Sequence, residues 1–111
     1  MSDEIAKTPE PPYYAVIFSS LRTEGDNGYG ETAARMEAMA KQQPGYLGVE
    51  MAREGLGITV SYWRSLEDIA AWKRVMDHAE AQRRGRADWY TAYCTRIAKV
   101  ERDYGFEKKP G

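Results

Sequence analysis

The chain has 111 residues, of which 16 are Lys or Arg and 17 are Asp or Glu, so its formal net charge is −1. This length suits one domain, and the charge balance provides no attraction toward nucleic acid or an anionic membrane surface. No uncharged stretch approaches the ~20 apolar residues of a membrane span. The acidic N-terminus does not resemble a secretory signal, and the single cysteine, Cys94, excludes an internal disulfide. We therefore expect a soluble, cytoplasmic, single-domain protein.

The first half of the chain contains a tail, a strand and a helix. Residues 1–12 hold three prolines among polar residues, a composition typical of an extended tail. Residues 14–21 (YAVIFSSL) are rich in β-branched and aromatic side chains and predict a strand, which the turn formers of residues 25–28 end. From Tyr29, apolar residues recur at i, i+4, i+7 and i+11, which predicts an amphipathic helix that Pro44-Gly45 ends.

The second half predicts a hairpin, a helix and a long strand. Residues 46–53 and 58–63 alternate between two faces and flank a short Gly-containing loop, a pattern typical of an antiparallel hairpin. Ser65 is a good N-cap for a helix that Gly85 ends. Residues 89–100 are strand-like over more than twice the ordinary ~5–6 residues of a strand.

The resulting order is β-α-β-β-α-β, the ferredoxin-like α+β arrangement, with a domain over residues 13–106 and a short C-terminal tail over 107–111. Both helices then cover one face of a four-stranded sheet and leave the other face open. An open apolar face implies an interface, and the long last strand suggests an arm that reaches a second subunit. We expect an isologous homodimer in which two sheets close into a barrel.

Several segments together carry a resemblance to a known family. They are residues 43–50 (QPGYLGVE), the strand 58–63 that ends in an aromatic residue and Trp, the helix with Trp72 and His78, and Trp89-Tyr90. Over residues 13–106 the chain resembles the antibiotic biosynthesis monooxygenase family, which implies the dimeric α/β-barrel fold. That superfamily includes cofactor-free oxygenases of aromatic polyketides and heme-degrading oxygenases, so the fold alone does not name the activity.

Cofactor-free oxygenation requires a dry cavity, a group that accepts the substrate proton and a donor for the developing anion. His78 is the only histidine and is the candidate catalytic base, since its ordinary pKa lies near neutrality. It lies about 120° around the helix from Trp72 and therefore flanks the apolar stripe. The alternative interpretation of His78 is a surface histidine at a helix end without chemistry.

The candidate substrate-binding residues are Trp63, Trp72, Ser20, Gln82 and Arg83. The two tryptophans can form the flat walls of an aromatic site, and core packing explains them as well. Ser20, Gln82 or Arg83 can form hydrogen bonds with the substrate, whereas a solvated helix end is the simpler interpretation of the last two.

Two further residues are expected to be structural. Glu50, in the middle of its strand, is expected to pair with an arginine such as Arg53 or Arg96, the alternative being burial in a cavity with a raised pKa. Cys94 lies in the middle of the last strand and is expected to be an ordinary buried thiol.

Other chemistries lack their motifs. One His and one Cys cannot form a zinc site, and the glycines do not match a dinucleotide-binding motif, so we expect no metal and no cofactor. In heme-degrading relatives the resemblance implies a Trp on the third strand, a His on the second helix and an Asn near the end of the first strand. Trp63 matches the first, and His78 is the only candidate for the second, at a displaced spacing after Trp72. The first strand has Ser19 and Ser20 and no Asn.

Two hypotheses of different class follow. The first is a cofactor-independent monooxygenase that acts on a small aromatic or quinol-like substrate between sheet and helices. The second is a dimeric module of the same fold that binds a small molecule without catalysis. Heme degradation is a distant third.

Overall fold

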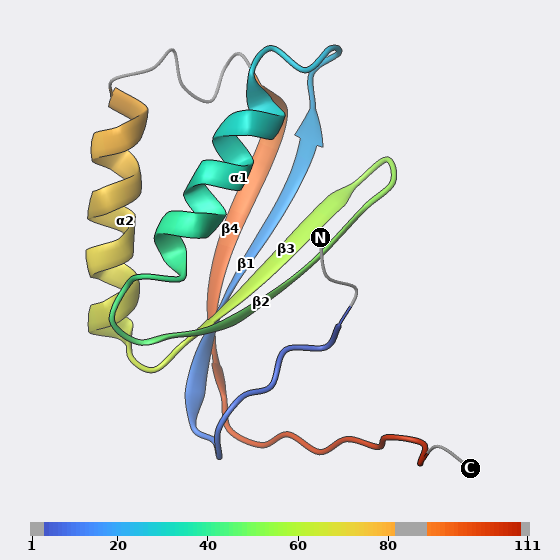
Figure 1. The fold of residues 1–111 in the computed structure, drawn as a ribbon, viewed down its shortest axis with the longest axis vertical. Helices are drawn as coiled ribbons and strands as arrows, with labels where there is room; N and C mark the ends of the chain where they lie inside the picture. Colours follow the sequence, from blue (N-terminus) through green and yellow to red (C-terminus); the bar gives the residue numbers. More distant parts are fainter. Residues whose placement is uncertain (1–3, 82–88, 110–111) are drawn as a thin grey trace.

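The computed structural model describes residues 4–81 and 89–109 of the chain. Its elements are β1 (Tyr13–Arg22), α1 (Tyr29–Ala40), β2 (Tyr46–Arg53), β3 (Gly57–Trp63), α2 (Leu66–Ala81) and β4 (Tyr90–Val100), as Figure 1 shows. This order confirms the predicted β-α-β-β-α-β arrangement. The predicted end of the second helix at Gly85 lies outside the described residues.

The strands form one antiparallel sheet in the order β2-β3-β1-β4. Both helices pack on the same face of it, because Ala40 of α1 and Ile69 and Trp72 of α2 form one buried cluster with Trp63 of β3. Tyr14 and Val16 of β1 also pack against this cluster. The layered arrangement predicted from the sequence is therefore confirmed, with its core at the Trp63 end of the sheet.

Local sequence explains where the helices begin. The Asp26 carboxylate accepts hydrogen bonds from the backbone N–H groups of Gly28 and Gly30, both at 3.0 Å, at the start of α1. Gly28 there has a φ of 84°, which favours glycine. At α2 the Ser65 hydroxyl accepts from the Asp68 N–H at 3.1 Å, the predicted N-cap.

Alternation along paired strands assigns every sheet residue to one of two faces. Tyr14 pairs with Trp63 and packs with it under the helices, so the even-numbered residues of β1 from Tyr14 to Ser20 lie on what we call the helix-facing face. The odd-numbered residues from Tyr13 to Leu21 lie on the opposite, open face. Exposed apolar side chains on the open face include Leu21 and Ile58, which are 44% and 40% exposed.

β4 is not an arm. It pairs with β1 along its whole length, from Tyr13↔Val100 to Arg22↔Tyr90. Its length therefore matches an equally long neighbour within its own sheet, and the inference that it reaches beyond that sheet is wrong. The open face is the remaining argument for a second subunit.

The pairing of Glu50 with an arginine is also wrong. The Glu50 carboxylate accepts from the Tyr62 hydroxyl at 2.7 Å and from the Ala6 N–H at 2.9 Å. Arg53 is three residues further along β2 and so lies on the helix-facing face, while Arg96 lies on β4 at the other edge of the sheet. Glu50 thus fastens the N-terminal segment across the open face.

A second group of bonds ties the two ends of the chain together. The Tyr13 hydroxyl bonds to the Asp103 carboxylate, and the Thr8 hydroxyl donates to the Tyr13 oxygen at 2.9 Å.

Cys94, expected to be buried, is exposed, because it lies on the open face of the edge strand β4. Within the described residues, no helix is long and apolar enough to cross a membrane.

Candidate functional site

The two tryptophans predicted to bind substrate stack on each other inside the core. Trp63 is fully buried and Trp72 is 7% exposed, and their ring centroids lie 6.0 Å apart with planes at 24°. Tyr46 meets Trp63 edge-on at 5.6 Å, and the Trp63 Nε1–H donates to the Ser61 hydroxyl at 2.9 Å. The indole of Trp63 is therefore enclosed by protein on every side, as a core residue is.

Ser20 lies at the opposite end of the helix-facing face. Its register partner Gly57 begins β3, whereas Trp63 ends that strand. Ser20 lies six residue positions along β1 from Tyr14, the partner of Trp63, and at ~3.4 Å per position this is about 20 Å. A small aromatic molecule cannot contact both ends, so Ser20 and the tryptophan pair belong to different regions of the face.

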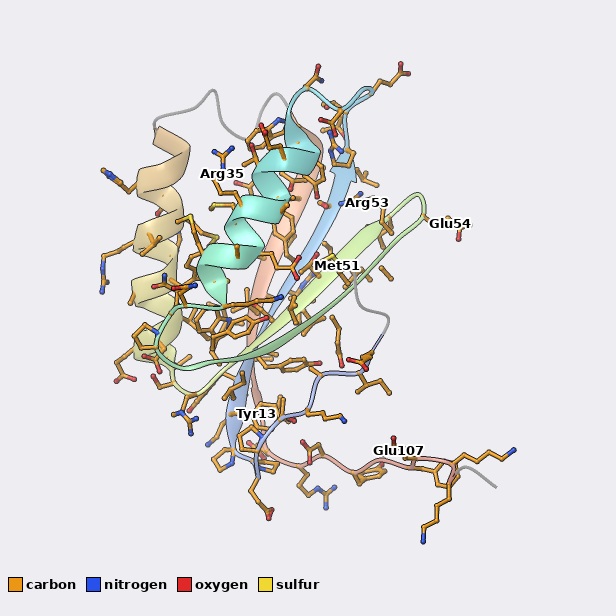
Figure 2. The ribbon with its side chains drawn as sticks, in the orientation of Figure 1. Tyr13, Arg35, Met51, Arg53, Glu54 and Glu107 are labelled. Carbon is orange, nitrogen blue, oxygen red and sulfur yellow. The ribbon has the colours of Figure 1, made fainter. Side chains whose placement is uncertain are left out.

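Ser20 is held by an arginine that sequence reasoning assigned to another role. The Arg53 Nη2 donates to the Ser20 hydroxyl at 2.6 Å, and Nη1 donates to the Ser20 carbonyl at 3.3 Å. Ser20 itself is only 2% exposed. Figure 2 shows Arg53 near the tip of the β2–β3 hairpin, with its side chain extending toward β1.

Three aromatic rings adjoin this pair on the same face. The Phe18 centroid lies 5.4 Å from that of Tyr90 and 5.3 Å from that of Tyr93, and the two tyrosine rings are 5.8 Å apart. Tyr29 at the start of α1 meets Tyr90 at 5.8 Å. Phe18 and Tyr90 are partly buried, and Tyr93 is 40% exposed. These rings form an aromatic surface that solvent reaches from the Tyr93 side.

Burial and a hydrogen bond with Tyr29 raise the pKa of the Tyr90 phenol well above its usual value, although the positive charges of Arg53 and Arg22 oppose the shift. A phenol with a raised pKa keeps its proton at neutral pH. Tyr90 is therefore a hydrogen-bonding group rather than an anion that could neutralise Arg53.

Arg22, in contrast, has a structural role. Its Nε donates to the Trp89 carbonyl at 2.8 Å and its Nη2 to the Gly25 carbonyl at 3.2 Å, while its guanidinium lies 3.6 Å from the centre of the Tyr29 ring. The Trp89 Nε1–H donates to the Asn27 carbonyl at 3.0 Å. These bonds hold the loop before α1 against the start of β4 and so fix the position of Tyr90.

The remaining predicted site residues come from α2 and the segment after it. His78 is exposed in the last turns of α2. Because α2 starts beside Trp63 and runs toward the end of the sheet where β4 begins (Figure 1), its C-terminal half is at the Ser20 end. Gln82 and Arg83 lie outside the described residues.

No group of three or more possible metal ligands occurs within residues 4–81 and 89–109. A pocket of about 370 Å³ lies instead between the two chain ends, and it contains none of the predicted site residues. Its lining comprises Glu10, Pro11 and residues 101–104.

The sequence alone did not single out four residues of this candidate site, which are Arg53, Phe18, Tyr90 and Tyr93. The signal for Arg53 was its position in the strand alternation, which puts it on the same face as Met51 and Val49. This position predicts a contact with Ser20 only once the strand register is known, because the register places Ser20 two strands away on the same row.

Comparison with known proteins agrees with this architecture. Residues 12–84 match the family model described as Antibiotic biosynthesis monooxygenase. The chain is 54% identical over 110 residues to the protein YqjZ of Bacillus subtilis (strain 168), which is described as uncharacterized, covering 97% of this chain and 96% of that one. The chain therefore belongs to the antibiotic biosynthesis monooxygenase family.

Two solved structures of similar fold differ in what they do. SnoaB of Streptomyces nogalater, a cofactor-independent oxygenase, matches with a TM-score of 0.62 and 12% identity, covering 88% of this chain and all of that one. The heme-degrader MhuD of Mycobacterium tuberculosis matches with a TM-score of 0.53 and 22% identity over 82% of this chain and 99% of its own. Identities this low establish the shared fold and leave the activity of this chain open.

Proposed function

We propose that the protein is a cofactor-independent monooxygenase that oxidises a small aromatic or quinol-like substrate on the helix-facing face of its sheet. One observation carries this proposal: the aromatic surface of Phe18, Tyr90 and Tyr93 adjoins Ser20, the residue to which the Arg53 guanidinium is hydrogen-bonded. An aromatic surface holds a flat ring, and adjacent donors stabilise an oxyanion. The family membership and the cofactor-independent oxygenase SnoaB among its structural neighbours support it.

The reaction requires no cofactor because the substrate supplies all the electrons. In an anthrone, for example, the methylene carbon loses both hydrogens and gains one oxygen atom of dioxygen as a carbonyl. The second oxygen atom leaves as water with those two hydrogens. The first step is loss of a proton, for which His78 is the proposed acceptor. The resulting anion reduces dioxygen, and Arg53 is the proposed donor that stabilises the negative charge.

In this proposal the residues named from the sequence have separate roles. Ser20 orients Arg53, and Gln82 and Arg83 remain proposed substrate contacts in the segment after α2. Trp63 and Trp72 form the closed floor of the helix-facing face instead of a wall that touches substrate.

The test is dioxygen consumption by the metal-free protein with a panel of anthrones and hydroquinones. Wild-type protein is expected to consume one dioxygen per anthrone, and heavy-isotope dioxygen is expected to put one atom in the product and one in water. The His78→Ala variant should lose most of the turnover, since general-base catalysis contributes about 10²-fold or more. The Arg53→Gln variant should also lose most of it, since it removes the charged donor that stabilises the anion. The exposed Arg74→Gln variant on α2 is the matched control.

Turnover that survives His78→Ala unchanged would remove His78 as the base. Dioxygen uptake by none of the substrates would favour the second hypothesis, a non-catalytic module that binds a small molecule. Heme degradation stays third, because β1 has Ser19 and Ser20 and no asparagine, the residue that the resemblance to heme-degrading relatives implies near the end of the first strand.

We also propose that the protein is a homodimer joined through the open face of the sheet. Leu21 and Ile58 are exposed apolar residues of that face, and burial of such surface is the main favourable contribution to stable association. The family's dimeric barrel provides the arrangement.

A further inference from the structure

Arg53 carries a positive charge that no carboxylate neutralises in the described part of the chain. The ion pairs there are Arg35–Glu31, Lys41–Glu37 and Lys73–Asp77, all between helical residues one turn apart. Both hydrogen bonds of the Arg53 guanidinium go to Ser20, a neutral residue. A guanidinium held in a fixed position without a counter-ion attracts an anion.

The geometry of these bonds leaves one edge of the guanidinium available. Nη1 and Nη2 each use one N–H on Ser20, at the outer end of the planar group. The Nε–H and the second Nη2–H point along the adjacent edge, side by side. Two parallel N–H groups match the two oxygens of a carboxylate, which they bind in a bidentate manner.

The sheet provides a specific place for this side chain. One row across all four strands contains Arg53 of β2, Gly57 of β3, Ser20 of β1 and Tyr93 of β4. A Cβ at the buried Gly57 would lie 2.1 Å from the Arg53 Cζ, so the guanidinium crosses β3 only because residue 57 has no side chain. Arg53 is itself an exposed residue, and its guanidinium crosses the sheet along this row to reach the buried Ser20.

An aromatic surface continues the row beyond Ser20. The rings of Phe18, Tyr90 and Tyr93 lie within 5.3 to 5.8 Å of one another, and Tyr93 pairs with Ser20 across β1 and β4. A flat ring that stacks here places a substituent on its edge near Arg53. The surface and the free guanidinium edge together select a ligand with both an aromatic ring and an anionic group.

We propose that Arg53 and the rings of Phe18, Tyr90 and Tyr93 form a binding site for an aromatic carboxylate, whose carboxylate takes the free edge of Arg53. The inference deepens the proposed function, on which it rests for the claim that such a molecule is a substrate; binding itself does not depend on turnover. Ser20 and Gly57 are positioning residues that act through Arg53.

Isothermal titration calorimetry with naphthalene carboxylate and its uncharged amide, naphthalene carboxamide, tests the site without any reaction. Wild-type protein is expected to bind the carboxylate at least about tenfold more tightly than the amide, a difference of about 1.4 kcal/mol. In Arg53→Gln the two ligands should bind within twofold of each other. Arg53→Lys keeps the charge but not the paired donors and should retain only part of the preference.

Two further variants separate positioning from folding. Gly57→Ala leaves Arg53 in the chain but displaces its guanidinium, so it should lose the preference for the carboxylate while circular dichroism remains native. Arg74→Gln removes a charge elsewhere and should bind like wild type. Equal affinity for carboxylate and amide in the wild type, no binding of the carboxylate, or a preference that survives Arg53→Gln would each overturn the proposal.

The outcome is distinguishable from that of the proposed function. Binding that depends on Arg53 without any dioxygen uptake would keep this site and reject the oxygenase. Uptake on anthrones that is unaffected by Arg53→Gln, combined with equal binding of the two naphthalene ligands, would keep the oxygenase and reject this site.

Discussion

Replacing Trp63 with alanine tests whether the tryptophan pair is core or ligand site. The Trp63 side chain is fully buried, stacks on Trp72 and meets Tyr46 edge-on. Truncation of a buried Trp to Ala costs about 3–5 kcal/mol, which includes the lost aromatic contacts. The substitution also leaves the Ser61 hydroxyl without the donor that it accepts from, which adds about 1 kcal/mol. The expected loss is therefore about 5 kcal/mol.

Such a loss is a large part of the ~5–15 kcal/mol that stabilise a domain. It lowers the melting temperature by about 20 °C, at ~4 °C per kcal/mol for a chain of this size. The assay is urea unfolding followed by circular dichroism at a fixed protein concentration, because association contributes to apparent stability. Trp63→Phe keeps a stacked ring and should lose only about 1–2 kcal/mol.

The matched control is Leu56→Ala in the β2–β3 loop. Leu56 is 52% exposed, so its truncation should cost less than about 1 kcal/mol. If Trp63→Ala costs no more than Leu56→Ala, the indole does not belong to the core. The interpretation of Trp63 as a wall of an open ligand site would then be the better one.

Three other outcomes are expected. Ser65→Ala removes the acceptor for the Asp68 N–H and should cost about 1 kcal/mol in chemical denaturation; an unchanged midpoint would show that the cap does not stabilise α2. Burial and the hydrogen bond to Glu50 raise the pKa of Tyr62, so this phenol stabilises the fold fully below pH ~10 and progressively less above it, where the unfolded chain loses the proton first. Tyr62→Phe should flatten this alkaline fall in unfolding free energy, and an identical fall in both proteins would contradict the assignment. Light scattering at micromolar concentration should give a dimer for the wild type and a shift toward monomer for Leu21→Glu, whereas a wild-type monomer would exclude the dimer.

The contacts of the candidate site could not be predicted from local sequence patterns. Ser20 was predicted as a polar substrate contact, and in the structure its hydrogen-bond partner is Arg53, 33 residues away in the chain. Nothing in the sequence around Arg53 distinguishes a residue that pairs with Glu50 from one that crosses β3 toward β1. Strand order and register decide this, since they place Gly57 between Arg53 and Ser20.

For the tryptophans, local patterns predicted the face of each residue but not what its ring contacts. Alternation correctly grouped Trp63 with Ser61, and helical spacing put Trp72 on the apolar stripe. Whether their rings meet each other or a ligand depends on how α2 lies on the sheet. In the structure α2 brings Trp72 to within 6.0 Å of Trp63, centroid to centroid, and closes that space.

By itself, the sequence determined the number, type and order of the elements, the hairpin and the family. These features follow from alternation, helical spacing, capping and turn residues, which act over a few positions along the chain. Only the tertiary structure decided that β4 pairs within its own sheet, that Glu50 holds the N-terminal segment, and that Arg53 lies beside an aromatic surface. The physical reason is that each of these contacts joins residues distant in sequence, whose meeting depends on strand order, on register and on the face to which a side chain points.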